Sequence, residues 1–425
     1  MAPGGANPSP ILEVSRLYLI LGNSIAAISA VEALRKVDPN GSITIVAKEG
    51  EPAYSPVLTP YYIAGELPRE RLYLRKKSFY REHKVELICN DGAAKVFTDR
   101  KEVLLESGVL LKYDRLLIAT GGRPRPAAFP GAALKGVFVL RSLLDAANIR
   151  NYALGKRDAV ILGGGPISMR SAWALRKLDI RISLVISSNR LLSRLVDEEV
   201  SLRLEEALLR DGGYRIYKNC DLLAARGKEK VESVELNNGE SIPAQLIVVG
   251  KGVIANKELV EGTEIATANG ILTDERMETN SPGVFAAGDV TQAYDRVRKK
   301  NMVNAIWPAA FAQGKVAGLN MAGASATFTG TVPMNVIEVG GVSLATIGVR
   351  TDKTVSMRAG NALKKIYLGE NKITGAVFLD DLRGIGLLHT LIRNEVPLDR
   401  LPSPQRLLEN IEYCRLLRIF SRKAG

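Results

Sequence analysis

The sequence has few residues of the kinds that bind metals or form disulfides. Its 425 residues include three cysteines, Cys89, Cys220 and Cys414, and two histidines, His83 and His389. No two cysteines form a CxxC pair, and the histidines lie far apart. These absences exclude a disulfide scaffold, and we expect no zinc or iron–sulfur site within this chain.

The sequence also lacks a recognisable targeting segment and a long hydrophobic run. Residues 1–15 begin with a small, uncharged, Pro/Gly-rich stretch without the basic region of a signal peptide, so we expect a loose tail. The uncharged stretch over residues 17–31 is too short to cross a bilayer. We therefore expect no membrane span and a cytoplasmic protein.

Negative charge is scarce relative to positive charge. The chain has 58 Lys and Arg against 45 Asp and Glu, which gives a formal net charge of +13. Such an excess suits nucleic acid, an anionic membrane or an acidic protein partner. The hydrophobic fraction of 46% is that of a globular chain. At about 150 residues per domain, the length suggests about three domains.

Two β-α-β patterns are present. In the first, an apolar strand over residues 17–21 is followed by a turn, a helix to Arg35 and a second strand over residues 43–47. Gly22 permits the sharp turn, and the small Ser24 and Ala27 permit close approach of a pyrophosphate to the helix N-terminus. Glu49, 27 residues after Gly22, is placed to accept a hydrogen bond from a ribose hydroxyl.

The second pattern starts about 140 residues later. A strand over residues 159–162 leads into the turn Gly163-Gly-Gly165, then a helix that contains Ser168, and a strand over residues 181–186. Two such units predict two bound dinucleotides.

Two further segments carry a family resemblance. Residues 113–124 form a strand that ends in the turn Ala119-Thr120-Gly121, and residues 279–289 form a strand that ends in Gly288-Asp289. In this order, with the two glycine turns, the chain resembles the two-dinucleotide-fold flavoproteins of the pyridine nucleotide–disulfide oxidoreductase class. Within that class it is most similar to NAD(P)H-dependent rubredoxin and ferredoxin reductases and to flavin subunits of multi-subunit redox complexes.

The resemblance implies an α/β fold of two Rossmann-like dinucleotide-binding domains, one inserted in the other, plus a small C-terminal α+β domain. It implies an FAD domain of residues 16–120 and 260–325, an NAD(P)-binding domain of residues 135–252 and a C-terminal interface domain of residues 330–425. The FAD site would comprise Gly22, Ser24, Ala27, Glu49, Ala119, Thr120, Gly121, Gly288, Asp289 and Trp307. The nicotinamide site would comprise Gly163, Gly165, Ser168, Ser187 and Arg190. Trp307 would either stack beside the flavin or belong to the core.

The same resemblance implies an FAD-dependent NAD(P)H oxidoreductase that exchanges a hydride with nicotinamide and single electrons with an iron–sulfur protein or subunit. Residues 52–62, which match the segment that carries the redox cysteines of disulfide reductases, contain no cysteine. Thiol chemistry is therefore not expected, and an external electron partner is. No residue is assigned a catalytic role of its own, because the chemistry belongs to the flavin.

The second unit departs from the family. Ile186 stands where an acidic residue usually selects NAD, and Ser187, Ser188 and Arg190 could hold the 2′-phosphate of NADP. Arg170 stands where the family has a glutamate close to the nicotinamide. NADH and NADPH both remain open, and the alternatives are a stand-alone NADH oxidase or an FAD-binding subunit with a degenerate nicotinamide site.

Basic residues gather in clusters. One follows Asp289 and contains Arg296, Arg298, Lys299 and Lys300, which we expect near the flavin, where they would steer an acidic iron–sulfur partner. Another, near the C-terminus, contains Arg406, Arg415, Arg418, Arg422 and Lys423. Without a recognition motif, nucleic acid is not expected. By analogy with multi-subunit enzymes, the partner complex could include a molybdenum or tungsten enzyme.

Overall fold

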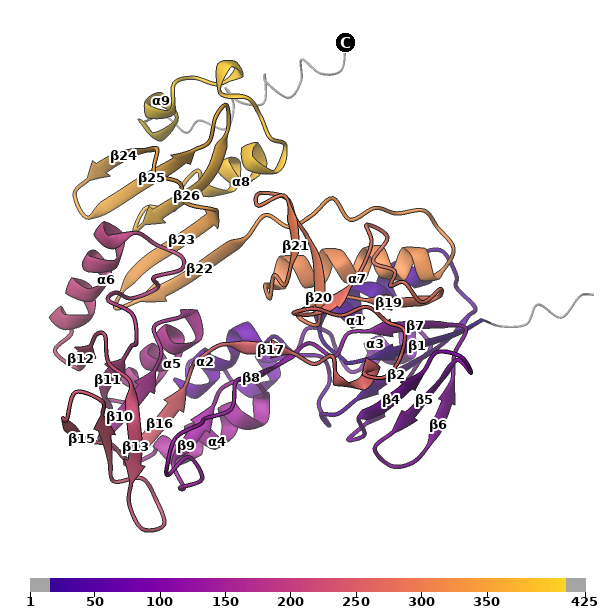
Figure 1. The fold of residues 1–425 in the computed structure, drawn as a ribbon, viewed down its shortest axis with the longest axis horizontal. Helices are drawn as coiled ribbons and strands as arrows, with labels where there is room; N and C mark the ends of the chain where they lie inside the picture. Colours follow the sequence, from indigo (N-terminus) through magenta and orange to yellow (C-terminus); the bar gives the residue numbers. More distant parts are fainter. Residues whose placement is uncertain (1–15, 410–425) are drawn as a thin grey trace, which may run out of the picture.

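The fold is that of a computed structural model, which describes residues 16–409 (Figure 1). The tail predicted for residues 1–15, Cys414 and all of the C-terminal basic cluster except Arg406 lie outside the described residues. The chain forms three lobes, each built around its own sheet. In Figure 1 the first lobe lies on the right, the second at the lower left and the third at the top.

The first lobe contains a five-stranded parallel sheet in the order β19-β7-β1-β2-β3. Its strands are β1 (Leu17–Leu21), β2 (Ser42–Ala47), β3 (Val85–Cys89), β7 (Arg115–Ile118) and β19 (Val284–Ala286). The antiparallel strands β4 (Ala93–Phe97), β5 (Glu102–Leu105) and β6 (Leu110–Lys112) add residues such as Val96 and Val103 to a core with β1 and β7. Strand β19 follows β7 by more than 160 residues, so the lobe is built from two separate stretches of the sequence.

Two helices of the first lobe, α1 (Ile25–Arg35) and α7 (Trp307–Met321), lie in close contact. A Cβ atom on Gly314 would stand 2.1 Å from the Ala26 carbonyl oxygen, and one on Gly318 would stand 2.3 Å from that of Ala30. Only glycine allows the helix backbones to approach this closely. This packing fixes where both helices begin, at the carboxyl edge of the sheet.

The second lobe contains a second five-stranded parallel sheet, in the order β12-β11-β10-β16-β9. Its strands are β9 (Val137–Val139), β10 (Asp158–Leu162), β11 (Arg181–Val185), β12 (Tyr214–Tyr217) and β16 (Leu246–Val249). Its helices are α4 (Leu143–Ala153), α5 (Pro166–Arg176) and α6 (Glu198–Arg210). A small antiparallel sheet of β13 (Leu222–Arg226), β14 (Ser233–Leu236) and β15 (Ser241–Pro243) is joined to it.

Two elements join the first and second lobes. Strand β8 (Gly122–Pro124) pairs with β17 (Val253–Ala255), so the entry into the second lobe and the exit from it run side by side. The short helix α2 (Thr59–Ile63) contacts both α4 and α5, and its Ile63 belongs to the second lobe's core. Helix α3 (Ser78–Glu82) contacts β3, and strand β18 (Ile271–Leu272) pairs with the strand over residues 291–295; both belong to the first lobe.

The third lobe contains an antiparallel five-stranded sheet, in the order β22-β23-β26-β25-β24. Its elements are β22 (Met334–Val339), β23 (Val342–Gly348), β24 (Thr354–Ala359), β25 (Ala362–Leu368), β26 (Ile373–Leu379), α8 (Ile385–Arg393) and α9 (Pro404–Glu409). The hairpin of β20 (Thr291–Asp295) and β21 (Lys300–Met302) extends from the first lobe toward this sheet (Figure 1). The predicted α/β fold with two Rossmann-like parallel sheets is confirmed.

The described part of the chain contains neither a membrane-spanning helix nor a cluster of metal ligands. Within residues 16–409, no helix is long and apolar enough to cross a membrane. In the same range, no group of three or more His, Cys, Asp and Glu side chains is arranged to hold a metal ion. The cytoplasmic location stays a prediction.

Candidate functional site

The first glycine turn leaves no room for a side chain. Gly22 has φ +109°, and a Cβ there would stand 2.2 Å from the carbonyl oxygen of Ala119. The turn between β1 and α1 is therefore in direct backbone contact with the Ala119-Thr120-Gly121 turn that follows β7. Two of the predicted site segments, nearly 100 residues apart, are therefore adjacent at the carboxyl edge of the sheet, where open α/β sheets bind their ligands.

The helices after the two glycine turns begin without side-chain caps. Ser24 precedes α1 without a capping hydrogen bond from its side chain, and Gly165, which precedes α5, has no side chain. By contrast, α4 begins with a capping box between Ser142 and Asp145, and Asp197 caps α6. The first N–H groups of α1 and α5 therefore lack a side-chain acceptor, as a pyrophosphate-binding helix requires.

The end of β2 positions the predicted ribose ligand. The hydroxyl of Tyr54 donates to the Glu49 carboxylate at 2.7 Å and accepts the backbone N–H of Leu143 at 2.9 Å. The Glu49 residue is partly open to solvent, but nearby protein atoms desolvate its carboxyl group and raise its pKa. The hydrogen bond from Tyr54 lowers the pKa but does not cancel this effect. Tyr54 thus fixes Glu49 in place and ties it to the start of α4.

Asn256 holds the Ala119-Thr120-Gly121 turn. Its side-chain amide donates to the Thr120 carbonyl at 2.9 Å, and its own carbonyl accepts the Thr120 hydroxyl at 3.0 Å. The backbone N–H of Asn256 also donates to Gly121. The sequence reasoning did not find Asn256, because its partner lies 136 residues away.

Asp289 has a cationic partner that the sequence reasoning also missed. The Arg141 guanidinium lies 3.0 Å from the Asp289 carboxylate, and a Cβ on Gly121 would stand 3.0 Å from the same guanidinium. Arg141 belongs to the second lobe, so it brings Gly121 and Asp289 together across the junction. In the sequence, the one indication of Arg141 is its position directly before Ser142, the N-cap of helix α4.

Gly288 and Trp307 are placed by helix α7. The Gly288 N–H donates to the buried Gln313 side chain at 2.8 Å, which anchors the Gly288-Asp289 turn on this helix. Trp307 is the first residue of α7 and packs partly buried against the first lobe's core. Its contacts so far support the core interpretation, and the flavin-stacking role stays a prediction.

The second glycine turn repeats the geometry of the first. Gly163 has φ +104°, and a Cβ there would stand 2.5 Å from the carbonyl oxygen of Gly250. Ser168 is fully buried, and its hydroxyl lies within hydrogen-bond distance of the Leu162 and Gly250 carbonyls. Ser168 therefore supports the turn from inside the lobe.

The loop after β11 contains the remaining predicted nicotinamide-site residues. Ile186 is buried, and a Cβ on Gly164 would stand 3.2 Å from its side chain, so the apolar residue closes the back of the turn. Ser187 is exposed, and the buried Nε of Arg190 has no hydrogen-bond partner. The two terminal nitrogens of Arg190 donate to the Asn189 side chain and to the Ser193 carbonyl, each at 3.4 Å, so the guanidinium is held within this loop. The choice between NADH and NADPH stays open.

Arg170 lies at the junction of the first and second lobes. Its guanidinium stands 5.3 Å from the ring centroid of Tyr61 on α2, and Tyr61 in turn contacts Trp173 of α5 edge to face at 5.0 Å. Burial lowers the pKa of Arg170, because desolvation disfavours the charged form. Among the described residues, Arg170 forms no ion pair.

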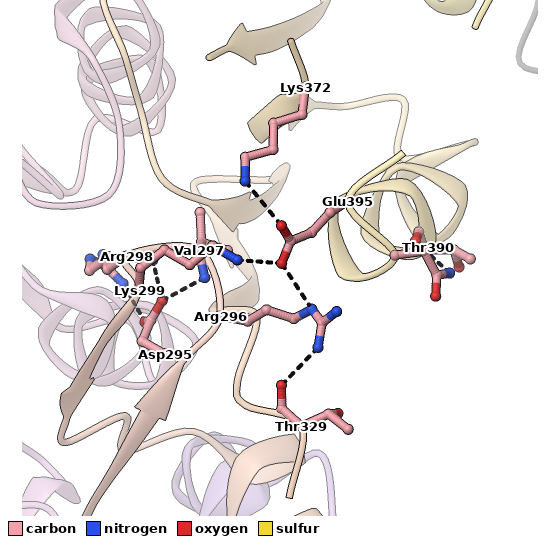
Figure 2. Close-up of polar contacts among 10 residues, drawn as sticks. Asp295, Arg296, Val297, Arg298, Lys299, Thr329, Lys372, Thr390 and Glu395 are labelled. Atoms are coloured by element: carbon pink, nitrogen blue, oxygen red, sulfur yellow. Dashed lines mark hydrogen bonds and ion pairs between the residues drawn. The ribbon is translucent and has the colours of Figure 1, made fainter. Parts of the chain in front are cut away.

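The basic cluster after Asp289 lies at the tip of the β20–β21 hairpin. Figure 2 shows Arg296, Lys299 and Lys372 converging on the Glu395 carboxylate, at 3.5 Å for Arg296 and 3.1 Å for Lys372. Arg298 points away from Glu395 and pairs with the buried Asp295 at 2.8 Å. The tip is roughly 20 Å along the extended chain from Asp289. The hairpin tip contacts the third lobe through these ion pairs, and the expected position beside the flavin stays a prediction.

Comparisons with known proteins agree with this geometry. The family model described as pyridine nucleotide-disulphide oxidoreductase matches residues 17–314. The chain is 31% identical over 395 residues to the NADH-dependent phenylglyoxylate dehydrogenase subunit epsilon of Aromatoleum evansii, covering 91% of this chain and 93% of that protein. It is 30% identical over 403 residues to the NADH-rubredoxin oxidoreductase of Clostridium acetobutylicum, covering 93% of this chain and all of that protein.

Solved structures give the same result. The covalent putidaredoxin reductase–putidaredoxin complex matches with a TM-score of 0.86 at 25% identity, covering 96% of this chain and 99% of that one. The NADH:rubredoxin oxidoreductase of C. acetobutylicum matches with a TM-score of 0.77 at 27% identity, covering 93% of this chain and all of that one.

The residues present fit the cofactors of this family. Two turns whose glycines admit no Cβ each lead into a helix without a side-chain cap, and carboxylates stand at the ends of β2 and β19. The chain belongs to the pyridine nucleotide-disulphide oxidoreductase family, as an FAD-dependent NAD(P)H oxidoreductase.

Proposed function

We propose that this protein passes electrons between NAD(P)H and an iron–sulfur protein or subunit, as the flavin subunit of a larger redox complex. The observation that carries the proposal is the composition of residues 52–62, which contain no cysteine. Helix α2 instead presents Tyr61 and Tyr62 to the second lobe. Without a thiol to receive electrons from the flavin, the acceptor must come from outside the chain.

In this proposal the residues of the first lobe hold the FAD. The α1 N-terminus with Gly22, Ser24 and Ala27 would bind the pyrophosphate, Glu49 the adenosine ribose, and Asp289 the ribityl hydroxyls. When bound, FAD supplies two-electron exchange with nicotinamide and one-electron exchange with a metal centre. The N-terminus of α7 would stabilise negative charge near its first turn.

The turn of Gly163 and Gly165, supported by Ser168, would bind the nicotinamide dinucleotide. Ser187 and Arg190 would contact its adenosine ribose or a 2′-phosphate, so NADH and NADPH both remain candidates. The corresponding domain boundaries are residues 16–120 and 260–325 for FAD, 135–252 for NAD(P) and 330–425 for the interface domain.

The partner proposal is supported by relatives and by charge. One relative is named as a dehydrogenase subunit and another as a rubredoxin oxidoreductase. The hairpin cluster with Lys372 contains five cations against the two carboxylates of Asp295 and Glu395, so it remains positive after its ion pairs form. Such a surface favours an acidic partner. A molybdenum or tungsten enzyme as a further member of the complex stays a prediction.

Anaerobic stopped-flow mixing of the flavoprotein with NADH or NADPH tests the reductase function. We expect one of the two to bleach the flavin absorbance. If neither does, the nicotinamide site is degenerate, as Arg170 and Ile186 allow. Fast oxygen uptake with NADH and no partner would instead support a stand-alone oxidase and refute the need for an acceptor.

Electron transfer to an acidic iron–sulfur protein such as rubredoxin tests the partner. Lys300 is exposed at the hairpin tip, and Lys300→Glu should slow rubredoxin reduction at low salt while leaving flavin reduction unchanged. Lys228→Glu is the matched control, an equally exposed lysine in the second lobe. Equal rates in the two variants would exclude the hairpin as the docking surface.

A further inference from the structure

A cavity of about 280 Å³ lies where the three lobes meet. It is lined by Arg194 from the second lobe, Arg298 from the hairpin of the first lobe and Arg350 from the third. Asn335, Thr346 and Tyr367 of the third lobe's sheet add polar groups to its wall. These residues come from the hairpin tip, from the third lobe's sheet and from the loop before α6, all of which Figure 1 draws.

Two of the three arginines bring unbalanced positive charge to this cavity. Neither Arg194 nor Arg350 forms an ion pair within residues 16–409, and none of the described lining residues is acidic. Arg298 pairs with Asp295 at 2.8 Å. The Asp197 carboxylate, which accepts the Tyr367 hydroxyl, already pairs with Lys365 at 2.8 Å. The carboxylates that touch lining residues therefore do not neutralise Arg194 and Arg350.

The site is also held in shape before any ligand arrives. The Arg350 guanidinium donates to the backbone carbonyls of Val196 and, at 3.0 Å, of Ser193. These carbonyls flank Arg194, so Arg350 fixes the loop that carries it. Carbonyls accept hydrogen bonds but leave the guanidinium charge uncompensated. Cations from three separate segments line one cavity, and arginines so gathered bind anions through charge-assisted hydrogen bonds.

We propose that this cavity binds a phosphate or diphosphate group. Its volume lies below the range of about 300–1,000 Å³ for drug-sized ligands, so it suits a compact anion. Guanidinium forks match phosphate oxygens in geometry as well as in charge. The group can come from a free phosphate compound or from the 2′-phosphate of NADPH, since Arg194 follows the loop of Ser187 and Arg190. In the second case Ser187 and Arg190 would contact only the adenosine ribose, and the 2′-phosphate would lie in the cavity. The site itself does not depend on the electron partner proposed above.

Calorimetric titration of the full-length flavoprotein with sodium pyrophosphate at low ionic strength tests the site. Arg194→Gln is the variant of choice, because the exposed Arg194 side chain forms no hydrogen bond or ion pair with residues 16–409. Loss of one charge-assisted contact should weaken binding about 10- to 100-fold. Arg194→Lys should retain part of the affinity. Arg215→Gln, which removes an exposed arginine on β12 of the same lobe, is the matched control and should bind like wild type.

Competition with nucleotides separates the sources of phosphate. If saturating NADPH displaces pyrophosphate and NADH does not, the 2′-phosphate is the natural occupant. If neither displaces it, the ligand is a separate phosphate compound. Displacement by NADH would overturn the proposal, because it would place pyrophosphate at the glycine turn. Absence of saturable binding, or equal affinity in the Arg194→Gln and Arg215→Gln variants, would overturn it as well. Bleaching of the flavin by NADH, followed in the same variants, tests the reductase function independently.

Discussion

Replacing Gly22 by alanine probes the contact that brings the site together. The added Cβ would stand 2.2 Å from the carbonyl oxygen of Ala119 and 2.8 Å from its carbonyl carbon, both of them backbone atoms. These atoms belong to the turn after β7 and cannot rotate away, so the two turns must separate. Overpacking of this kind costs about 1–3 kcal/mol. The positive φ of +109° adds about 1–2 kcal/mol for a residue with a Cβ.

Gly155→Ala provides a matched control. Gly155 also has a positive φ, +71°, but a Cβ there would meet no atom within 4 Å. This variant therefore carries only the conformational cost of about 1–2 kcal/mol. Gly22→Ala should lose about 2–5 kcal/mol in total, and the difference between the two variants measures the close contact.

Chemical denaturation gives the free energy of unfolding of each variant, and the flavin absorbance of the purified protein gives its FAD content. Gly22→Ala should lose both stability and FAD, because the separated turns no longer form the pyrophosphate site. Gly155→Ala should keep its FAD. If Gly22→Ala is no less stable than Gly155→Ala and retains full FAD, the close approach of the two turns does not shape the site.

Three further predictions concern charged side chains. Lys365→Met removes the buried cation between two carboxylates of the second lobe, and it should lower the free energy of unfolding by about 3–5 kcal/mol in thermal or chemical denaturation. Lys299 and Lys372 lower the pKa of Glu395 below its ordinary 4.5, so its ion pairs stabilise the fold above about pH 4.5 and are lost as the pH falls. A thermal unfolding series from about pH 6 to about pH 3 should show a smaller acid loss in Glu395→Gln; an identical loss would contradict this role. Arg141→Gln removes the partner of Asp289 and should weaken FAD retention about tenfold in equilibrium dialysis, and unchanged retention would show that Arg141 only links the lobes.

The local architecture of both nucleotide units can be predicted from the sequence alone. Apolar strands that end at Gly22 and Gly163 predict a sharp turn into a helix at these positions. Such a turn needs a residue with positive φ, which glycine adopts readily. The turns after β7 and β19 are indicated by the family resemblance, and the structure gives their Gly121 and Gly288 positive φ as well. These features lie within short windows of sequence, where period and turn chemistry decide the structure.

The pairing of charged side chains from distant segments depends on the tertiary structure and cannot be predicted from the sequence. Arg141 pairs with Asp289 across 148 residues, and Glu395 collects cations from the hairpin tip and from Lys372. The extended strand β20 brings the basic cluster that follows Asp289 into contact with the third lobe, a contact that the local sequence does not indicate. Ion pairs depend on where separate segments pack, and no local pattern records that. The convergence of Arg194, Arg298 and Arg350 on one cavity is likewise a product of lobe packing, because each arginine lies on a different lobe.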